Sequence, residues 1–96
     1  MAHQIVLCTV SSNNYFLYLE RLIASVRINA PEAIVNIILV NVDRSKENYL
    51  KKINPNIIIN YEYIQFTNKE QLRGYCANRR ALFFVELMNE YDCPIA

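Results

Sequence analysis

The chain has 96 residues, of which 53% are hydrophobic and 20% charged, and its formal net charge is +1. This length allows one domain with a modest core, and the composition excludes disordered and collagen-like chains. The near-neutral charge argues against nucleic-acid binding, which usually requires a basic excess. The sequence contains neither a bilayer-spanning apolar run nor the basic start of a signal peptide. We therefore expect a cytoplasmic protein with a single domain over residues 1–96.

The first element predicted along the chain is a strand over residues 4–10. This short run is almost continuously apolar and rich in β-branched residues, which is typical of a strand buried on both faces. The polar residues 11–14 follow, and we expect them to turn the chain and cap a helix. Apolar residues then recur at helical spacing from Tyr15 to Ala30, and Pro31 ends that helix.

A second apolar strand is predicted over residues 34–42, with Asp43 at its carboxyl end. Residues 45–53 form a short predicted helix with Ser45 as a candidate cap. Residues 57–66 have the mixed pattern of an edge strand. A polar loop over residues 67–74 leads into a long helix from about Tyr75 to Tyr91, and residues 95–96 would begin a fourth strand.

Strands that alternate with helices predict an α/β fold, because parallel strands need helical crossovers. We expect a Rossmann-like three-layer sandwich with a small parallel sheet in the order 3-2-1. Ligands bind such sheets outside the carboxyl ends of the strands. The ligand-facing segments would therefore be residues 10–15, 41–43 and 66–74.

Residues 11–15 present hydroxyl and amide groups and one aromatic ring at the start of a predicted helix, which favours anions. The segment contains no glycine, so it is neither a phosphate-binding P-loop nor a dinucleotide-binding G-x-G-x-x-G turn. An ordinary strand-to-helix turn is the alternative interpretation.

Asp43 occupies the position where nucleotide-binding folds often place an acid against a ribose or base, although a turn or capping role is the alternative. Arg73, Asn78, Arg79 and Arg80 would place guanidinium groups near the ligand edge, where arginine forks match a diphosphate. A cation at the start of a helix opposes the helix dipole, so such an arginine needs an acidic partner or a bound anion. Both possibilities stay open from the sequence.

The three cysteines, Cys8, Cys76 and Cys93, are odd in number and lie in apolar surroundings, which favours reduced structural thiols. The sequence has no readable catalytic triad and no metal-ligand spacing.

Three segments together resemble the N-terminal half of a GT-A-fold glycosyltransferase with a family 8-type layout. They are IVLCTVSSNNYFLYLERLIASVRINAP, IVNIILVNVD and RGYCANRRALFFVELMNEYDCPIA. In that layout the first strand ends in a polar loop and a tyrosine, and an S-V-like stretch follows in the helix. The second strand ends in an acid, and a Y-x-x-x-R helix leads into a strand that carries a D-x-D metal motif.

The resemblance implies that the first loop and the last helix bind a nucleotide sugar, with a UDP-sugar as the expected ligand. The nucleotide pocket would be lined by Thr9, Val10, Ser11, Ser12, Asn13 and Asn14, with Tyr15 near the base. Asp43 would contact the uracil or ribose. Arg79 or Arg80, with Asn78 and Arg73, would face the diphosphate or donor sugar. The chain departs from the family in its first loop, where relatives often carry acids instead of Ser11, Ser12 and Asn13.

A second departure is that the D-x-D strand would lie beyond residue 96. The resemblance therefore implies a donor-binding part that is inactive alone, with a Mn²⁺ or Mg²⁺ ion bound by the complete enzyme. The alternative is a noncatalytic Rossmann-like binding or assembly module. Without a fourth strand, Val6, Leu7 and Cys8 would form an open apolar edge, which predicts self-association.

Overall fold

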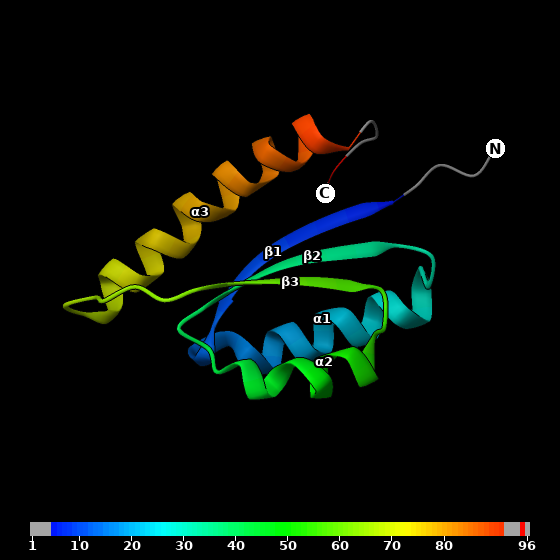
Figure 1. Cartoon of the computed structure of the whole chain (residues 1–96), viewed down its shortest axis with the longest axis horizontal. Helices are drawn as coiled ribbons and strands as arrows, with labels where there is room; N and C mark the ends of the chain where they lie inside the picture. Colours follow the sequence, from blue (N-terminus) through cyan, green and yellow to red (C-terminus); the bar gives the residue numbers. More distant parts are fainter. Residues whose placement is uncertain (1–4, 92–94, 96) are drawn as a thin grey trace.

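The computed structural model describes residues 5–91 and residue 95. Its elements are β1 (Val6–Ser12), the 3-10 turn η1 (Asn13–Tyr15), α1 (Phe16–Asn29), β2 (Ile34–Val40), the 3-10 turn η2 (Arg44–Lys46), α2 (Glu47–Ile53), β3 (Ile57–Glu62) and α3 (Lys69–Glu90). The predicted alternation of strands and helices is confirmed (Figure 1).

The three strands form one parallel sheet in the order β1-β2-β3. Helices α1 and α2 cover one face of this sheet, and α3 crosses the other face (Figure 1). The predicted α/β class and the strand order are therefore confirmed, and the layers are those of a small Rossmann-like sandwich. β3 lies at an edge, as its mixed pattern predicted.

The central strand β2 contributes side chains to two separate cores. Val35, Ile37 and Leu39 pack against α1 and α2, whereas Ile38 and Val40 pack against α3. Both faces of β2 are therefore covered, which explains why its sequence is apolar except for Asn36. Burial of each such side chain stabilises the fold by roughly 1.5–3 kcal/mol.

Asn41 ties together the chain segments that follow the three strands. Its backbone is left-handed, with φ 57°, a conformation that asparagine tolerates better than most residues. Its side chain donates to the Ile64 carbonyl at 2.8 Å and accepts from the Ile64 N–H at 2.8 Å. The Asn13 side chain donates to the Asn41 carbonyl at 3.2 Å. These bonds hold the carboxyl-end edge of the sheet in one arrangement.

Helix α3 begins at Lys69, earlier than the predicted start near Tyr75. Asn68 caps it, because its side chain accepts a hydrogen bond from the Gln71 N–H at 2.9 Å. The Gln71 side chain in turn accepts from the Thr67 N–H at 3.0 Å, which resembles a capping box. The predicted polar loop over residues 67–74 is therefore mostly helix. The expected opposition between arginines and the helix dipole is also wrong, since Arg79 and Arg80 lie in the middle of α3.

Other predicted boundaries shift by a few residues. β1 extends through Ser11 and Ser12, which are buried strand residues and make no side-chain cap to the following helix. The predicted capping by residues 11–14 is therefore wrong. The cap before α2 is Asp43 rather than Ser45, because Asp43 Oδ1 accepts from the Ser45 N–H at 2.8 Å. β2 and β3 end at Val40 and Glu62, before the predicted ends at 42 and 66.

Ile95 forms a parallel bridge with Val6, on the side of β1 opposite β2. It is 9% exposed and belongs to the core beneath α3. This bridge lies where the fourth strand was expected to begin, whereas Ala96 lies outside the described residues. Beyond Val6, the outer edge of β1 has no strand partner within residues 5–91. None of the helices described is long and apolar enough to cross a membrane.

Candidate functional site

A cavity of about 470 Å³ lies at the carboxyl end of β1, between α1 and α3. At this point the chain directions diverge, because α1 leads to β2 while α3 leads to Ile95 on the other side of β1. Open α/β sheets bind ligands at such a topological switch point. The cavity volume also falls in the range of roughly 300–1,000 Å³ that is usual for small-molecule sites. We call this cavity the switch-point pocket.

The floor of the switch-point pocket is formed by the last four residues of β1, Thr9, Val10, Ser11 and Ser12. Ser12 is 3% exposed, and its Oγ has no hydrogen-bond partner among the described residues. A buried hydroxyl left without a partner costs about 1–3 kcal/mol. Because Ser12 also lines the pocket, a ligand could supply the missing hydrogen bond.

The wall contributed by η1 and α1 is aromatic and apolar. It consists of Asn14, Tyr15, Tyr18, Leu19 and Leu22. The rings of Tyr15 and Tyr18 lie with their centroids 6.2 Å apart, and both rings are exposed. Exposed aromatic rings beside a polar floor suit the flat face of a base or the apolar face of a sugar.

The wall contributed by α3 is cationic. Lys69, Arg73 and Arg80 line the pocket with Leu72, Cys76 and Ala77. The spacing of four and seven residues places the cations on one face of the helix. Within the described part of the chain, none of the three cations forms an ion pair, and no carboxylate lines the pocket. The pocket therefore presents an uncompensated positive wall.

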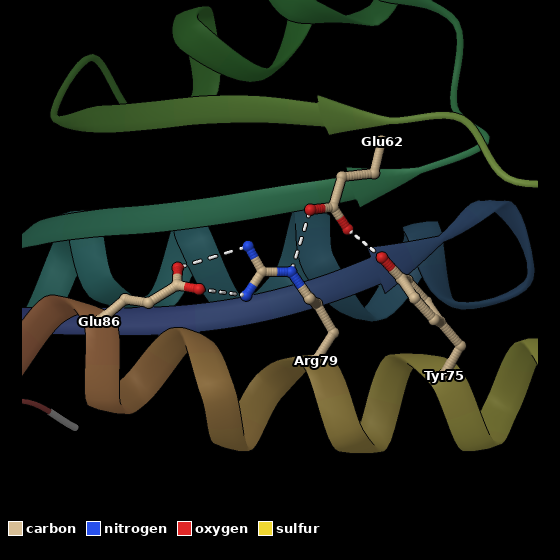
Figure 2. Close-up of polar contacts among 4 residues, drawn as sticks. All are labelled: Glu62, Tyr75, Arg79 and Glu86. Atoms are coloured by element: carbon tan, nitrogen blue, oxygen red, sulfur yellow. Dashed lines mark hydrogen bonds and ion pairs between the residues drawn. The ribbon is translucent and has the colours of Figure 1, made fainter.

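Arg79, the neighbour of Arg80, lies outside this pocket. Its Nε donates to Glu62 at 2.9 Å and its Nη1 donates to Glu86 at 3.1 Å, while the Tyr75 hydroxyl donates to Glu62 at 2.6 Å (Figure 2). Burial favours the protonated form of Glu62, but the hydrogen bonds from Tyr75 and Arg79 outweigh it and lower its pKa. Burial and the Glu62 hydrogen bond together raise the pKa of Tyr75 to about 12. Arg79 thus has the acidic partners that the sequence left open.

The thiols of Cys8 and Cys76 are free, as predicted, whereas Cys93 lies outside the described residues. Burial raises the pKa of both thiols, and the nearby positive charge of Arg80 acts in the opposite direction without overcoming it. Both thiols therefore stay protonated at neutral pH and are poor nucleophiles.

Most of the predicted site residues meet in the switch-point pocket. These are Thr9, Val10, Ser11, Ser12, Asn14, Tyr15, Arg73 and Arg80. Four others do not line it: Asn13, Asp43, Asn78 and Arg79. Asp43 is exposed at the cap of η2, where the hydrogen bonds from Ser45 lower its pKa. The sequence interpretation missed Tyr18 and Lys69, which also line the pocket. Helical spacing from Tyr15 would have indicated Tyr18, and a helix start at Asn68 would have indicated Lys69.

The residues of the pocket do not fit the divalent cation that the resemblance implies. Among the residues described, no group of three or more His, Cys, Asp or Glu side chains could hold a metal ion. The charged side chains that line the pocket are cations, which repel a metal and attract the anion that a metal would neutralise. We therefore assign no metal to these residues.

Comparison of the chain with models of known protein families, with curated proteins and with solved structures gives no match.

Proposed function

We propose that the switch-point pocket binds the nucleoside diphosphate portion of a nucleotide sugar, so that the chain is the donor-binding part of a glycosyltransferase. One observation carries this proposal. The buried, unpartnered hydroxyl of Ser12 lies in the same cavity as the cations of Lys69 and Arg73, at the switch point of a parallel sheet.

Each wall then has a separate role. The Arg73 guanidinium and the Lys69 ammonium neutralise the diphosphate, and the arginine fork matches two phosphate oxygens at once. The Ser12 hydroxyl donates to a phosphate or ribose oxygen. Asn14 and Tyr15 contact the base, which we take to be uracil.

The proposed contribution of this chain to sugar transfer is binding and orientation of the donor. No described residue is assigned as nucleophile or general base, and the acceptor and the catalytic groups are left to other parts of the enzyme. The free thiols of Cys8 and Cys76 favour a reducing compartment, and we propose that the protein acts in the cytoplasm.

Titration of the chain with UDP, followed by amide NMR shifts and calorimetry, tests this proposal. We expect shifts in residues 9–15 and in the first turns of α3. Arg73→Gln removes a charge-assisted hydrogen bond and should weaken UDP binding about 10- to 100-fold. The matched control is Arg21→Gln, which removes the same charge from an exposed position of α1 outside the pocket. Unchanged amide shifts in residues 9–15 at millimolar UDP would refute the proposal.

A second candidate function is assembly through the outer edge of β1, with a second copy of the chain as partner. Leu82, Val85 and Met88 are exposed at helical spacing on α3, and β1 has no strand partner beyond Val6 within residues 5–91. An open strand edge and exposed apolar side chains each favour pairing between chains. Light scattering should then show a dimer that Val85→Lys dissociates. A monomer at all concentrations would contradict this candidate.

A further inference from the structure

The cations of the switch-point pocket are spread along more of α3 than one diphosphate needs. An α-helix rises about 1.5 Å per residue, so Lys69 and Arg73 are about 6 Å apart along its axis, and Arg73 and Arg80 about 10 Å apart. The two phosphorus atoms of a diphosphate share one bridging oxygen. Because the two phosphates lie this close together, Lys69 and Arg73 are sufficient to bind a diphosphate. Arg80 lies too far along α3 to be needed for it and is free to bind another group of the ligand.

Arg80 also lies at a different depth from Ser12. Helix α3 begins beside the carboxyl end of β1 and leads back to Ile95, which pairs with Val6 at the amino end of that strand (Figure 1). Because Arg80 follows Arg73 by seven residues, it lies roughly 10 Å farther from the carboxyl end of β1. The pocket thus has an upper end at Ser12 and Arg73 and a lower end at Arg80.

The lower end of the pocket carries the positive charge of Arg80, which differs from its neighbour Arg79 in having no acidic partner among the described residues. Arg79 is neutralised by two carboxylates, whereas Arg80, the next residue of the helix, has none among the described residues. Arg80 is exposed and lines the pocket. An anionic group at this end of a ligand would supply the missing partner.

Space for a ring lies between the two ends. Ala77 is on the same face of α3 as Arg73 and Arg80, four residues after the first and three before the second, and its side chain ends at Cβ. Across the pocket, Tyr18 and Leu22 offer an aromatic and apolar wall. Along α3, the cations Lys69 and Arg73 would thus face the diphosphate and the small side chain of Ala77 would face the sugar ring. Arg80 would face an acidic group on that ring.

We propose that the nucleotide sugar bound by this pocket carries an acidic sugar of the uronic-acid class, and that Arg80 binds its carboxylate. An arginine binds a carboxylate through two parallel hydrogen bonds, which gives directional selectivity as well as affinity. This inference rests on the proposed function, since it assumes that the diphosphate binds at Arg73 and Ser12.

Calorimetry with UDP, UDP-glucose and UDP-glucuronate tests the inference. The two sugars differ only in that the C6 alcohol of glucose is a carboxylate in glucuronate. We expect the intact chain to bind UDP-glucuronate about tenfold or more tightly than UDP-glucose, the effect of one charge-assisted hydrogen bond. If UDP binds but UDP-glucose and UDP-glucuronate bind with equal affinity, the inference is overturned and the proposed function still stands. Failure of all three ligands to bind would overturn both.

Three variants separate specific recognition from general attraction of charge. Arg80→Gln should abolish the preference for UDP-glucuronate over UDP-glucose. Arg21→Gln removes the same charge elsewhere and should keep the preference. Ala77→Leu should weaken both sugars but not UDP, because its side chain fills the space for the ring. A preference for glucuronate that survives Arg80→Gln would overturn the inference, and the amide spectrum of each variant reports whether it is folded.

Discussion

The two sides of α3 differ in whether their arginines have acidic partners. On the side toward β3, Arg79 is bound by Glu62 and Glu86, and Tyr75 completes the hydrogen bonds of Glu62 (Figure 2). On the side toward the outer edge of β1, Arg73 and Arg80 line a cavity and have no carboxylate partner among the described residues. The first side therefore stabilises the protein through ion pairs, whereas the charges on the second side match the proposed ligand site.

This difference shows why arginine content alone does not locate a binding site. Arg79 is flanked by acids from β3 and from its own helix, so its charge is used within the fold. Arg80 faces the switch point, where the floor also holds the unpartnered hydroxyl of Ser12. Unsatisfied groups that gather in one cavity are better evidence of a ligand than any one of them.

The largest expected effect is loss of the contact that anchors α3 to the sheet. Phe83 is 5% exposed and lies in the core beneath α3. Phe83→Ala should lower the free energy of unfolding by about 3–5 kcal/mol, because it removes buried apolar area and leaves a cavity. Urea unfolding measures this loss. A loss below about 1 kcal/mol would mean that α3 is not packed as described.

Arg79→Gln should have a smaller but clear effect on stability. The substitution leaves Glu62 partly buried without its cation, and we expect a loss of about 1–2 kcal/mol, less than for a fully buried pair. Arg80→Gln, the matched control, should change stability by less than about 0.5 kcal/mol. Equal losses for the two variants in urea unfolding would remove the contrast between the two sides of α3.

The cap of α3 should contribute about 1 kcal/mol. Asn68→Ala removes the acceptor for the Gln71 N–H and should fray the first turn, which carries Lys69. Urea unfolding measures the loss of stability, and amide hydrogen exchange over residues 69–72 shows where it occurs. Unchanged exchange in this turn would contradict the assigned cap.

The Glu62 network also predicts a dependence on pH. The pKa of Glu62 is lowered in the folded chain from its ordinary value of 4.5, so its carboxylate stabilises the fold above that value. The stabilisation should be lost as the pH falls through the lowered pKa. We expect wild type and Glu62→Gln to differ in unfolding free energy at about pH 7, and this difference to shrink as the pH falls through the lowered pKa of Glu62. A constant difference would exclude ionisation of Glu62 as its source.

The fold was predictable because alternating apolar runs and helical spacing determine strands and helices locally. The start of α3 was missed because residues 67–74 are polar, although Asn68 and Gln71 carry the spacing of a capping box. The depth of Ser12 was missed for a related reason. Its polar side chain indicated a turn, whereas the parallel pairing with Val40 draws it into β1.

The division of roles between Arg79 and Arg80 could not be predicted. Cys76 and Phe83 mark the buried side of α3, and the two arginines lie at mirrored spacings of three and four residues from them. Helix periodicity therefore places both at the border of the buried side. The two arginines are distinguished only by what lies beside them: Glu62 on β3 for Arg79, and the open edge of β1 for Arg80. Both features depend on how the strands pair in the sheet, which the helix sequence does not encode.

The most direct test of the central claim is a UDP titration followed by amide chemical shifts of the whole chain. The account predicts that shifts will gather at residues 9–15 and along the first turns of α3, which carry Lys69 and Arg73, while Glu62 and Arg79 stay unchanged. Shifts confined to the Glu62 side of α3, or none at millimolar UDP, would contradict it.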